Sequence, residues 1–331
     1  MEQHTLRRHG LGLRGVDVRR VSPGYVLYAP LTSKTAHLVS TTGKEVHRWN
    51  LPYRAGRHAR ILPGGNLAFN GAHPEAPSLF PLWAKYHGGM MLQVSPDGTI
   101  MRQYSDPLAH HDQNHLDDDT ILYTTLEPLS TEEASRVQGG IPGSEAPNGI
   151  IYGDCIKLVQ PWSTNSVSSS ADFSGNGQSG AKLLWSWRAI DHLDPKLFAN
   201  YLNYSRQHWP LINSVALNSE GNIIASSRNA STVFIISRDT GAVLWYVSAP
   251  IVSQQHCVEE LNSAGDILVF DDVTEGGEVV WEYVVPQLGE FKGVMPAEEL
   301  EELKKAESSH PSNAVFRAYK YRPEEVPWIR E

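Results

Sequence analysis

Three histidines and an asparagine stand at nearly the same distance ahead of similar segments of this sequence. Each lies four or five residues before a leucine of a turn-and-strand segment, and the four are His58, His111, Asn213 and His256. His110 and Asp112 flank His111, and Arg228 follows a β-prone run. Neutral imidazole can be a nucleophile, a proton carrier or a metal ligand. Guanidinium presents a rigid fork of donors to an oxyanion. The residue types therefore favour group transfer, proton transfer or metal chemistry.

A single histidine at the start of a strand is more often structural than functional. In WD-type propellers, for example, such histidines only join neighbouring blades. Several polar residues in one register, together with Arg228, favour a shared pocket. We therefore expect residues that are far apart in the sequence to meet at one end of a repeated structure.

The repeat itself consists of an apolar position, a turn and a strand, followed by a hairpin that often carries Trp. The turn-and-strand copies are 61–69, 115–123, 216–226 and 260–270. The hairpin copies are 37–50, 91–105, 234–248 and 273–285, with a further copy split around a Ser/Gly-rich insert at 161–180 that we expect to be a mobile hairpin loop. Core packing explains the outer-strand tryptophans, which are Trp49, Trp185, Trp187, Trp245 and Trp281.

Short antiparallel strands repeated about every 45–55 residues predict an all-β chain with a β-propeller fold. Helix-forming patterns occur only at 131–138, 194–209 and 296–309, where we expect peripheral helices. We predict an N-terminal extension over residues 1–22 and one propeller domain over 23–331. The C-terminal segment NAVFRAYKY is expected to complete the first blade by pairing with GYVLYAPL.

The overall composition narrows the range of partners. Lys and Arg total 28 against 37 Asp and Glu, and this balance argues against a nucleic-acid or anionic-membrane surface. No apolar run has the length of a membrane span, and no secretory signal follows the basic N-terminus. Two cysteines, Cys155 and Cys257, are too few for a disulfide framework. We expect a cytoplasmic protein, and the sequence gives no indication of its oligomeric state.

The segments HHDQNHLDDDTILY, WPLINSVALNSEGNIIASSRNASTVFIISRDTGAVLW, QQHCVEELNSAGDILVFDD and NAVFRAYKY, in this order, resemble the aryl-sulfate sulfotransferase family. The resemblance extends over roughly residues 24 to 328. It implies a six-bladed propeller, of which five blades are recognisable here. It also implies transfer of a sulfuryl group between phenols through a sulfo-histidine, without a nucleotide sulfate donor, a metal or another cofactor.

The resemblance also implies roles for particular residues. His256 corresponds to the nucleophile, and His111, or its neighbour His110, corresponds to a histidine at the channel mouth. Asn213 and Arg228 correspond to residues that hold the sulfuryl oxygens. His58 is a further candidate for substrate binding. The segment 80–89 could overhang the channel, with Trp83 or Tyr86 as a wall for a flat phenolic ligand.

Three departures from the family pattern bear on activity. Leu211 stands where a sulfuryl-binding histidine is usual, and His208, three residues earlier, does not reach the same place on a strand. Cys257 replaces the aspartate that usually follows the nucleophile. About one blade is absent between ILVFDD and VTEGGEVVWEY, so the propeller closes with five blades or represents an incomplete six-bladed one.

Two other functions remain open on the sequence. In the first, His58, His111 and His256 hold a divalent metal in a propeller lyase or hydrolase. In the second, the protein is a non-catalytic scaffold whose propeller faces bind other proteins. The acidic run at 117–119 is interpreted as a turn. Fold alone does not decide among these functions.

Overall fold

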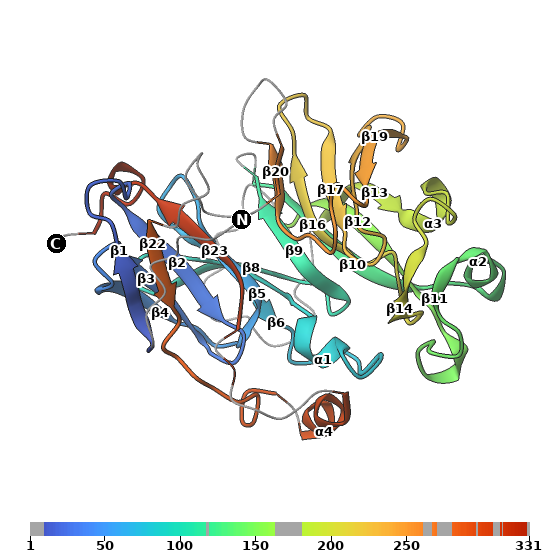
Figure 1. Ribbon diagram of the computed structural model, residues 1–331, viewed down its shortest axis with the longest axis horizontal. Coiled ribbons are helices and arrows are strands. Elements are labelled where there is room, and N and C mark those ends of the chain that lie inside the picture. The colour runs from blue at the N-terminus through green and yellow to red at the C-terminus, as the bar shows by residue number, and fades with distance from the viewer. Residues whose placement is uncertain are drawn as a thin grey trace. The chain divides into compact units, whose positions relative to one another are not determined.

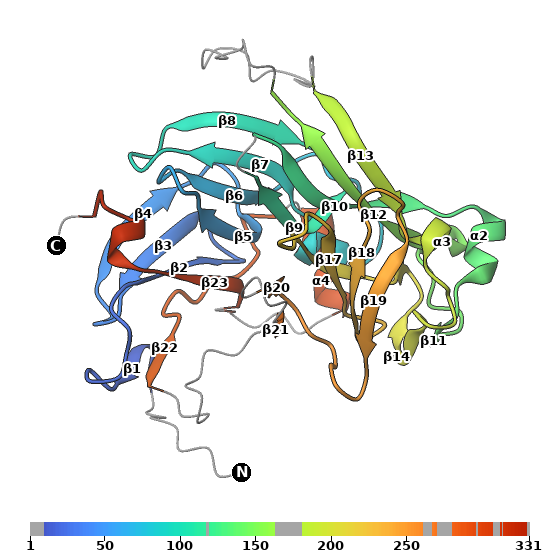
Figure 2. The same cartoon turned by 90° about the horizontal axis from the view of Figure 1, so that it is seen from above.

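The structure is a computed structural model that describes residues 10–116, 119–162, 181–260, 267–269, 280–295, 297–306, 312 and 314–329. The described chain is mostly β-strand with few, short helices (Figures 1 and 2). Its main sheets have four or five strands, as propeller blades do. The expected all-β propeller fold class is confirmed. The insert at 163–180 and the turn at 261–266 lie outside the described residues.

Contacts divide the chain into two compact units. The first unit comprises residues 1–74, 90–103 and 271–331, and the second comprises 75–89 and 104–270. The prediction of a single domain over 23–331 stays a prediction. Each unit has its own apolar core: Trp49, Phe69 and Leu92 are buried in the first, and Trp187, Trp209 and Phe234 in the second.

The first unit contains a sheet in which the last strand of the chain pairs with an early one. Its order is β23 (Val315–Tyr321), β2 (Tyr25–Pro30), β3 (Thr35–Ser40) and β4 (Glu45–Asn50) (Figure 2). Tyr25 is opposite Tyr321 in this antiparallel pair. A side chain at Gly24 would collide with the carbonyl of Tyr321, so the approach of the two strands requires glycine there. The expected closure of the first blade by NAVFRAYKY is confirmed.

A second sheet follows in chain order, made of β5 (Ala55–Ile61), β6 (Leu67–Ala72), β7 (Gly89–Val94) and β8 (Ile100–Ser105). Within the predicted N-terminal extension, β1 (Gly12–Val16) pairs with β22 (Trp281–Val284). The part of the expected hairpin at 273–279 lies outside the described residues.

The second unit holds the sheets that carry most of the candidate residues. One sheet has the order β13 (Lys182–Arg188), β12 (Tyr152–Gln160), β10 (Ile121–Pro128) and β9 (Ala109–His115), and β15 (His208–Trp209) joins β12 in parallel. The next runs β16 (Ile212–Leu217), β17 (Ile223–Ser227), β18 (Thr232–Ile236) and β19 (Val243–Ser248). β20 (Val258–Glu260) and β21 (Ile267–Val269) form a two-stranded pair.

The hydrogen bonds of the turns show that the repeats are not aligned at their leucines, contrary to the prediction from the sequence. The amides of Leu62, Leu116 and Asn218 donate to the carbonyls four residues later, at 2.8 to 2.9 Å. Leu217 therefore lies one residue earlier in its repeat than Leu62 and Leu116 do. Counted from the turn, Arg57 is equivalent to His111 and Asn213, and His58 is equivalent to Asp112 and Ser214. The expected equivalence of His58 and His111 is wrong by one residue.

Three of the outer-strand tryptophans donate a hydrogen bond to the hairpin turn of another sheet. The indole Nε1 atoms of Trp49, Trp187 and Trp281 lie 3.0, 2.9 and 3.0 Å from the carbonyl oxygens of Ser95, Gly241 and Thr41. Trp185 packs against the core of the second unit.

Trp245 departs from this pattern. Its side chain is 43% exposed, so its predicted role in the core is wrong.

Two of the three expected helices form. α2 (Thr131–Arg136) begins with a capping box between Ser130 and Glu133, and α4 spans Ala297–Ala306. The predicted helix over 194–209 is wrong: α3 spans only Ala189–His192, and residues 200–205 form β14. That backbone is extended because β14 pairs with β11 (Gly139–Ile141). Within the described residues, no helix has the length and apolar character needed to span a bilayer.

Candidate active site

His110 and His111 occupy an irregularity in β9 that turns their side chains toward each other. Thr124 on β10 is opposite His110, whereas Tyr123 is opposite Gln113, so two residues on β9 lie between consecutive pairs. His111 has φ 46°, a left-handed conformation that suits such a bulge. The two Nδ1 atoms are 2.8 Å apart, which is a hydrogen-bond distance. The imidazoles of His110 and His111 thus form a hydrogen-bonded pair.

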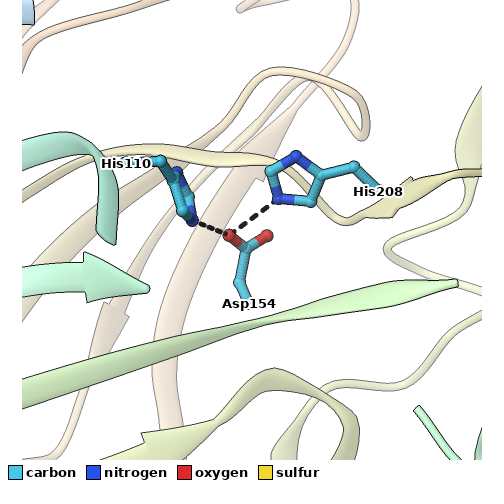
Figure 3. Close-up of side chains that lie close together, drawn as sticks. All are labelled: His110, Asp154 and His208. Atoms are coloured by element: carbon cyan, nitrogen blue, oxygen red, sulfur yellow. Dashed lines mark hydrogen bonds and ion pairs between the residues drawn. The ribbon is translucent and has the colours of Figure 1, made fainter. Parts of the chain in front are cut away.

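Asp154 lies at the centre of this part of the second unit. Its Oδ1 is 3.0 Å from Nε2 of His208, which is a hydrogen bond, and 3.0 Å from Nε2 of His110, which is an ion-pair contact (Figure 3). Its Oδ2 accepts the backbone N–H of Ile212 at 2.9 Å. Burial alone would raise the pKa of Asp154, but His208 and His110 outweigh burial and lower that pKa to about 2. Asp154 is therefore an ionised acceptor at neutral pH.

The position of His208 follows from parallel pairing with the strand that carries Asp154. Tyr152 of β12 is opposite His208 of β15. The carbonyl oxygen of His208 also accepts from the side-chain amides of Asn200 and Asn229, at 3.2 and 3.3 Å. Its imidazole binds Asp154, which gives His208 a structural partner that the sequence did not indicate.

Aromatic rings from a short helix and the segment before it pack against these imidazoles. Tyr86 of α1 (Trp83–Tyr86) lies with its ring centroid 4.8 Å from that of His111, and Trp83 lies 6.1 Å from His110. Phe80 lies 6.2 Å from His208. The segment predicted to overhang the site therefore contacts its histidines. A role as the wall for a phenolic ligand stays a prediction.

The donor atoms of His110, Asp154 and His208 all lie within 4.8 Å of one another, so this set has the chemical types that a divalent metal uses. It is not the set expected from the sequence, which was His58, His111 and His256. The separations of 3.0 Å between each Nε2 and Oδ1 are those of N–H···O contacts. A hydrogen bond from His208 and a close polar contact with His110 account for this geometry.

Asn213, Arg228 and His256 lie in the adjoining part of the second unit. The amide Nδ2 of Asn213 donates to the carbonyl of Gln255 at 2.8 Å, which fixes the backbone next to His256. Nδ1 of the half-buried His256 lies 3.1 Å from the carbonyl oxygen of Gln254. The guanidinium of Arg228 lies over the ring of Tyr204, 4.5 Å from its centroid. Asn213 thus bonds to the residue that precedes His256 in the sequence. Arg228 lies on the face of an aromatic ring.

The side chain of Gln255 holds the segment before β20 in place. Its Nε2 lies 3.1 Å from Oγ of Ser226, 3.2 Å from the carbonyl of Ser227 and 3.1 Å from the carbonyl of Thr232. Gln255 is buried, so these bonds fix the backbone that carries His256. This role was missed from the sequence.

His58 is in the first unit, buried between aromatic residues. Its ring centroid is 6.3 Å from that of Phe316 and 6.0 Å from that of Tyr319. Its neighbour Arg57 places its guanidinium over Phe316, 5.0 Å from the ring centroid. A substrate-binding role for His58 stays a prediction.

Asp154 was also missed, although its sequence carries a signal. It is a single carboxylate in the strand YGDCIKLVQ, and the strand is mostly buried. A buried carboxylate needs partners, so a charged residue in such a strand predicts a polar cluster. The identity of the partners does not follow from sequence, because His110 and His208 lie on other strands.

The fold and these contacts define an all-β protein of propeller type. Residues 162–283 match the sequence model of the arylsulfotransferase (ASST) family, and this match supports membership of the chain in that family. The matched segment contains Asn213, Arg228 and His256. No curated protein matches the chain.

The solved structures that match this chain share little of its sequence. A protein of unknown function from Bacteroides caccae is 11% identical with a TM-score of 0.37, and the match covers 83% of this chain and 97% of that one. The WD40 β-propeller domain of Doa1 is 13% identical with a TM-score of 0.38, covering 75% and 58%. The hydrazine synthase of Kuenenia stuttgartiensis is 14% identical with a TM-score of 0.38, covering 65% and 49%.

Proposed function

We propose that this protein transfers a sulfuryl group from an aryl sulfate to a phenol through a covalent sulfo-histidine on His256. The family match over the segment that contains Asn213, Arg228 and His256 is the observation that carries this proposal. The bond from Asn213 to the Gln255 carbonyl supports it, because it joins a proposed sulfuryl-binding residue to the backbone beside the proposed nucleophile.

The contact of His256 with a carbonyl fits the role of nucleophile. Because a carbonyl oxygen can only accept, Nδ1 of His256 carries the proton and the electron pair of the neutral ring lies on Nε2. In the first step, Nε2 forms a bond to sulfur while the bond from sulfur to the phenolic oxygen breaks. In the second step, the oxygen of the acceptor phenol attacks the same sulfur and His256 is released.

Arg228, Asn213 and the histidine pair would assist these two steps. Arg228 and Asn213 would donate to the sulfuryl oxygens as charge spreads over them. His111, with His110 beside it, would supply a proton to the leaving phenolate and remove one from the acceptor. The reaction so written needs neither a metal nor a nucleotide donor, and its partners are small aryl sulfates and phenols.

Intact mass spectrometry after brief incubation with 4-nitrophenyl sulfate tests the proposal. We expect a sulfuryl adduct on the parent protein and none on His256→Ala. His192→Ala is the matched control, because His192 stacks on Trp187 in the second unit and has no contact with the candidate residues in the part described. An adduct on His256→Ala would show that another residue is the nucleophile. A folded parent protein without any adduct would rule out the transfer and favour a binding role.

A further inference from the structure

His111 is connected to a buried carboxylate through one intervening imidazole. Nδ1 of His111 lies 2.8 Å from Nδ1 of His110, and Nε2 of His110 lies 3.0 Å from Oδ1 of Asp154. Exposure along this series rises from 1% for Asp154 and 1% for His110 to 4% for His111. Of the three residues, His111 has the largest exposed fraction.

The contacts fix the proton positions when both imidazoles are neutral. Nε2 of His110 lies 3.0 Å from the ionised Oδ1 of Asp154, and this ion-pair contact favours the tautomer of His110 with its proton on Nε2. Nδ1 of the neutral His110 then has the electron pair, and Nδ1 of His111 must donate to it. The electron pair of His111 is therefore on Nε2.

Asp154 is well suited to fix the proton positions on His110 and His111 because both of its carboxylate oxygens are held by hydrogen bonds. Its Oδ2 accepts the N–H of Ile212 at 2.9 Å, and its Oδ1 also accepts from Nε2 of His208 at 3.0 Å. The carboxylate cannot turn away from His110 without breaking one of these bonds. The pair of donors on Oδ1 also keeps a buried negative charge compensated.

We propose that Asp154 and His110 are positioning residues that make Nε2 of His111 the atom that exchanges a proton with the phenolic substrate. This inference rests on the proposed sulfuryl transfer and adds Asp154, which the transfer step itself does not use, as the residue that orients His110. His208 acts with them by holding Asp154 in place.

The proton balance closes over the two half-reactions. When the acceptor phenol attacks sulfur, its proton moves to Nε2 of His111. The proton on Nδ1 of His111 can then pass to Nδ1 of His110, which places the positive charge beside Asp154. In the next cycle these transfers reverse, and Nε2 of His111 gives its proton to the leaving phenolate.

Asp154→Asn tests the inference because the amide keeps the shape but can donate to His110. If His110 then accepts at Nε2, Nδ1 carries its proton and donates to His111, whose own proton moves to Nε2. The same substitution in a serine protease triad leaves the geometry intact and traps the wrong tautomer, at a cost of about 10⁴-fold in kcat. We expect a slower second half-reaction by about 10² to 10⁴-fold.

Two readouts separate the inference from the proposed function. Long-range ¹H–¹⁵N correlation spectra of protein labelled at histidine identify the protonated nitrogen of His111, assigned by comparison with His111→Gln. We expect Nδ1–H in the parent and Nε2–H in Asp154→Asn. 4-Nitrophenolate leaves without a proton, so Asp154→Asn should still form the adduct from 4-nitrophenyl sulfate and then retain it in the presence of a phenol.

Asp106→Asn is the matched control. Asp106 accepts from the hydroxyls of Tyr123 and Thr125 and from Lys157, and within the described residues it contacts no histidine. It should change neither the His111 tautomer nor the lifetime of the adduct. If Asp154→Asn does not fold, His110→Phe keeps the ring volume and should lengthen the adduct lifetime in the same way.

Several results would overturn the inference. An unchanged His111 tautomer in folded Asp154→Asn would do so, as would an adduct lifetime equal to that of the parent. Stoichiometric zinc in the purified parent that is lost in Asp154→Asn would show a metal centre in place of the proton path. A parent without an adduct but with the expected tautomer change would contradict the sulfuryl transfer and leave the positioning of His111 intact.

Discussion

Oδ2 of Asp112 accepts the backbone N–H of Val215 at 2.9 Å and so joins β9 to β16, the first strands of two successive sheets. Ser214 repeats the arrangement one sheet later, where its Oγ accepts the N–H of Val258 at 3.0 Å. Asp112 and Ser214 occupy the same place relative to the turn that follows each strand. The repeated polar position therefore consists of two consecutive residues. The second, Asp112 or Ser214, joins the first strands of neighbouring sheets. The first is His111 or Asn213.

Asp112→Ala should lower the free energy of unfolding by about 1–3 kcal/mol, because it leaves the buried N–H of Val215 without its acceptor. Asp112→Asn retains an oxygen acceptor and should cost less. Urea unfolding followed by tryptophan fluorescence measures both. Equal losses for the two variants would mean that the charge of Asp112, and not the bond to Val215, stabilises the sheet.

The closure of the first sheet by β23 leads to a second expectation. The hydroxyl of Tyr321 accepts the backbone N–H of Ile61 at 2.8 Å, so it ties β23 to β5 as well as to β2. Tyr321→Phe should therefore cost about 1–3 kcal/mol in the free energy of unfolding. Deletion of residues 314–331 exposes the edge of β2 and should abolish the cooperative thermal transition. A truncated protein with the parent's melting temperature would refute this role.

Much of the fold could be predicted from local pattern. Turn residues between β-prone runs located the hairpins β3–β4, β7–β8 and β18–β19, because tight turns restrict residue type. The register could not be read from leucines alone, since Leu217 faces Ile223 inside a strand pair while Leu116 opens a turn. The strand at 200–205 was missed because its pairing with β11 overrides a helix-like local sequence.

The candidate site was less accessible to sequence analysis. His110 and His111 could be singled out because they sit at a repeated position, but their mutual bond depends on a bulge that the repeat does not indicate. Asp154 and His208 meet through the parallel pairing of β12 with β15, across 54 residues of sequence. Such pairing has no local sequence signal, so the contact between Asp154 and His208 could not be predicted from the sequence.

Tyr86 provides a test of the aromatic wall. Its ring lies 4.8 Å from that of His111, and stacking of this kind contributes about 0.5–1.5 kcal/mol. Tyr86→Ala should raise the KM for 4-nitrophenyl sulfate by roughly 2- to 10-fold if the ring also contacts the substrate. Tyr86→Phe keeps the ring and should leave KM near that of the parent. A change in kcat alone for Tyr86→Ala would indicate that the ring positions His111 and does not bind the phenol.

The low pKa of Asp154 predicts how stability depends on pH. Burial opposes ionisation, but His208 and His110 lower the pKa to about 2 from the ordinary value of 3.8. The unfolded state therefore binds a proton at higher pH than the folded state does, and the stabilisation is complete above about pH 4 and lost as the pH falls toward 2. A shift of this size corresponds to roughly 2 kcal/mol. Urea unfolding of the parent and of Asp154→Asn between pH 5.5 and 3 measures this contribution. The difference between their free energies of unfolding should be constant at the upper end of this range and shrink below pH 4. A constant difference throughout would contradict an ionised Asp154 in the folded protein.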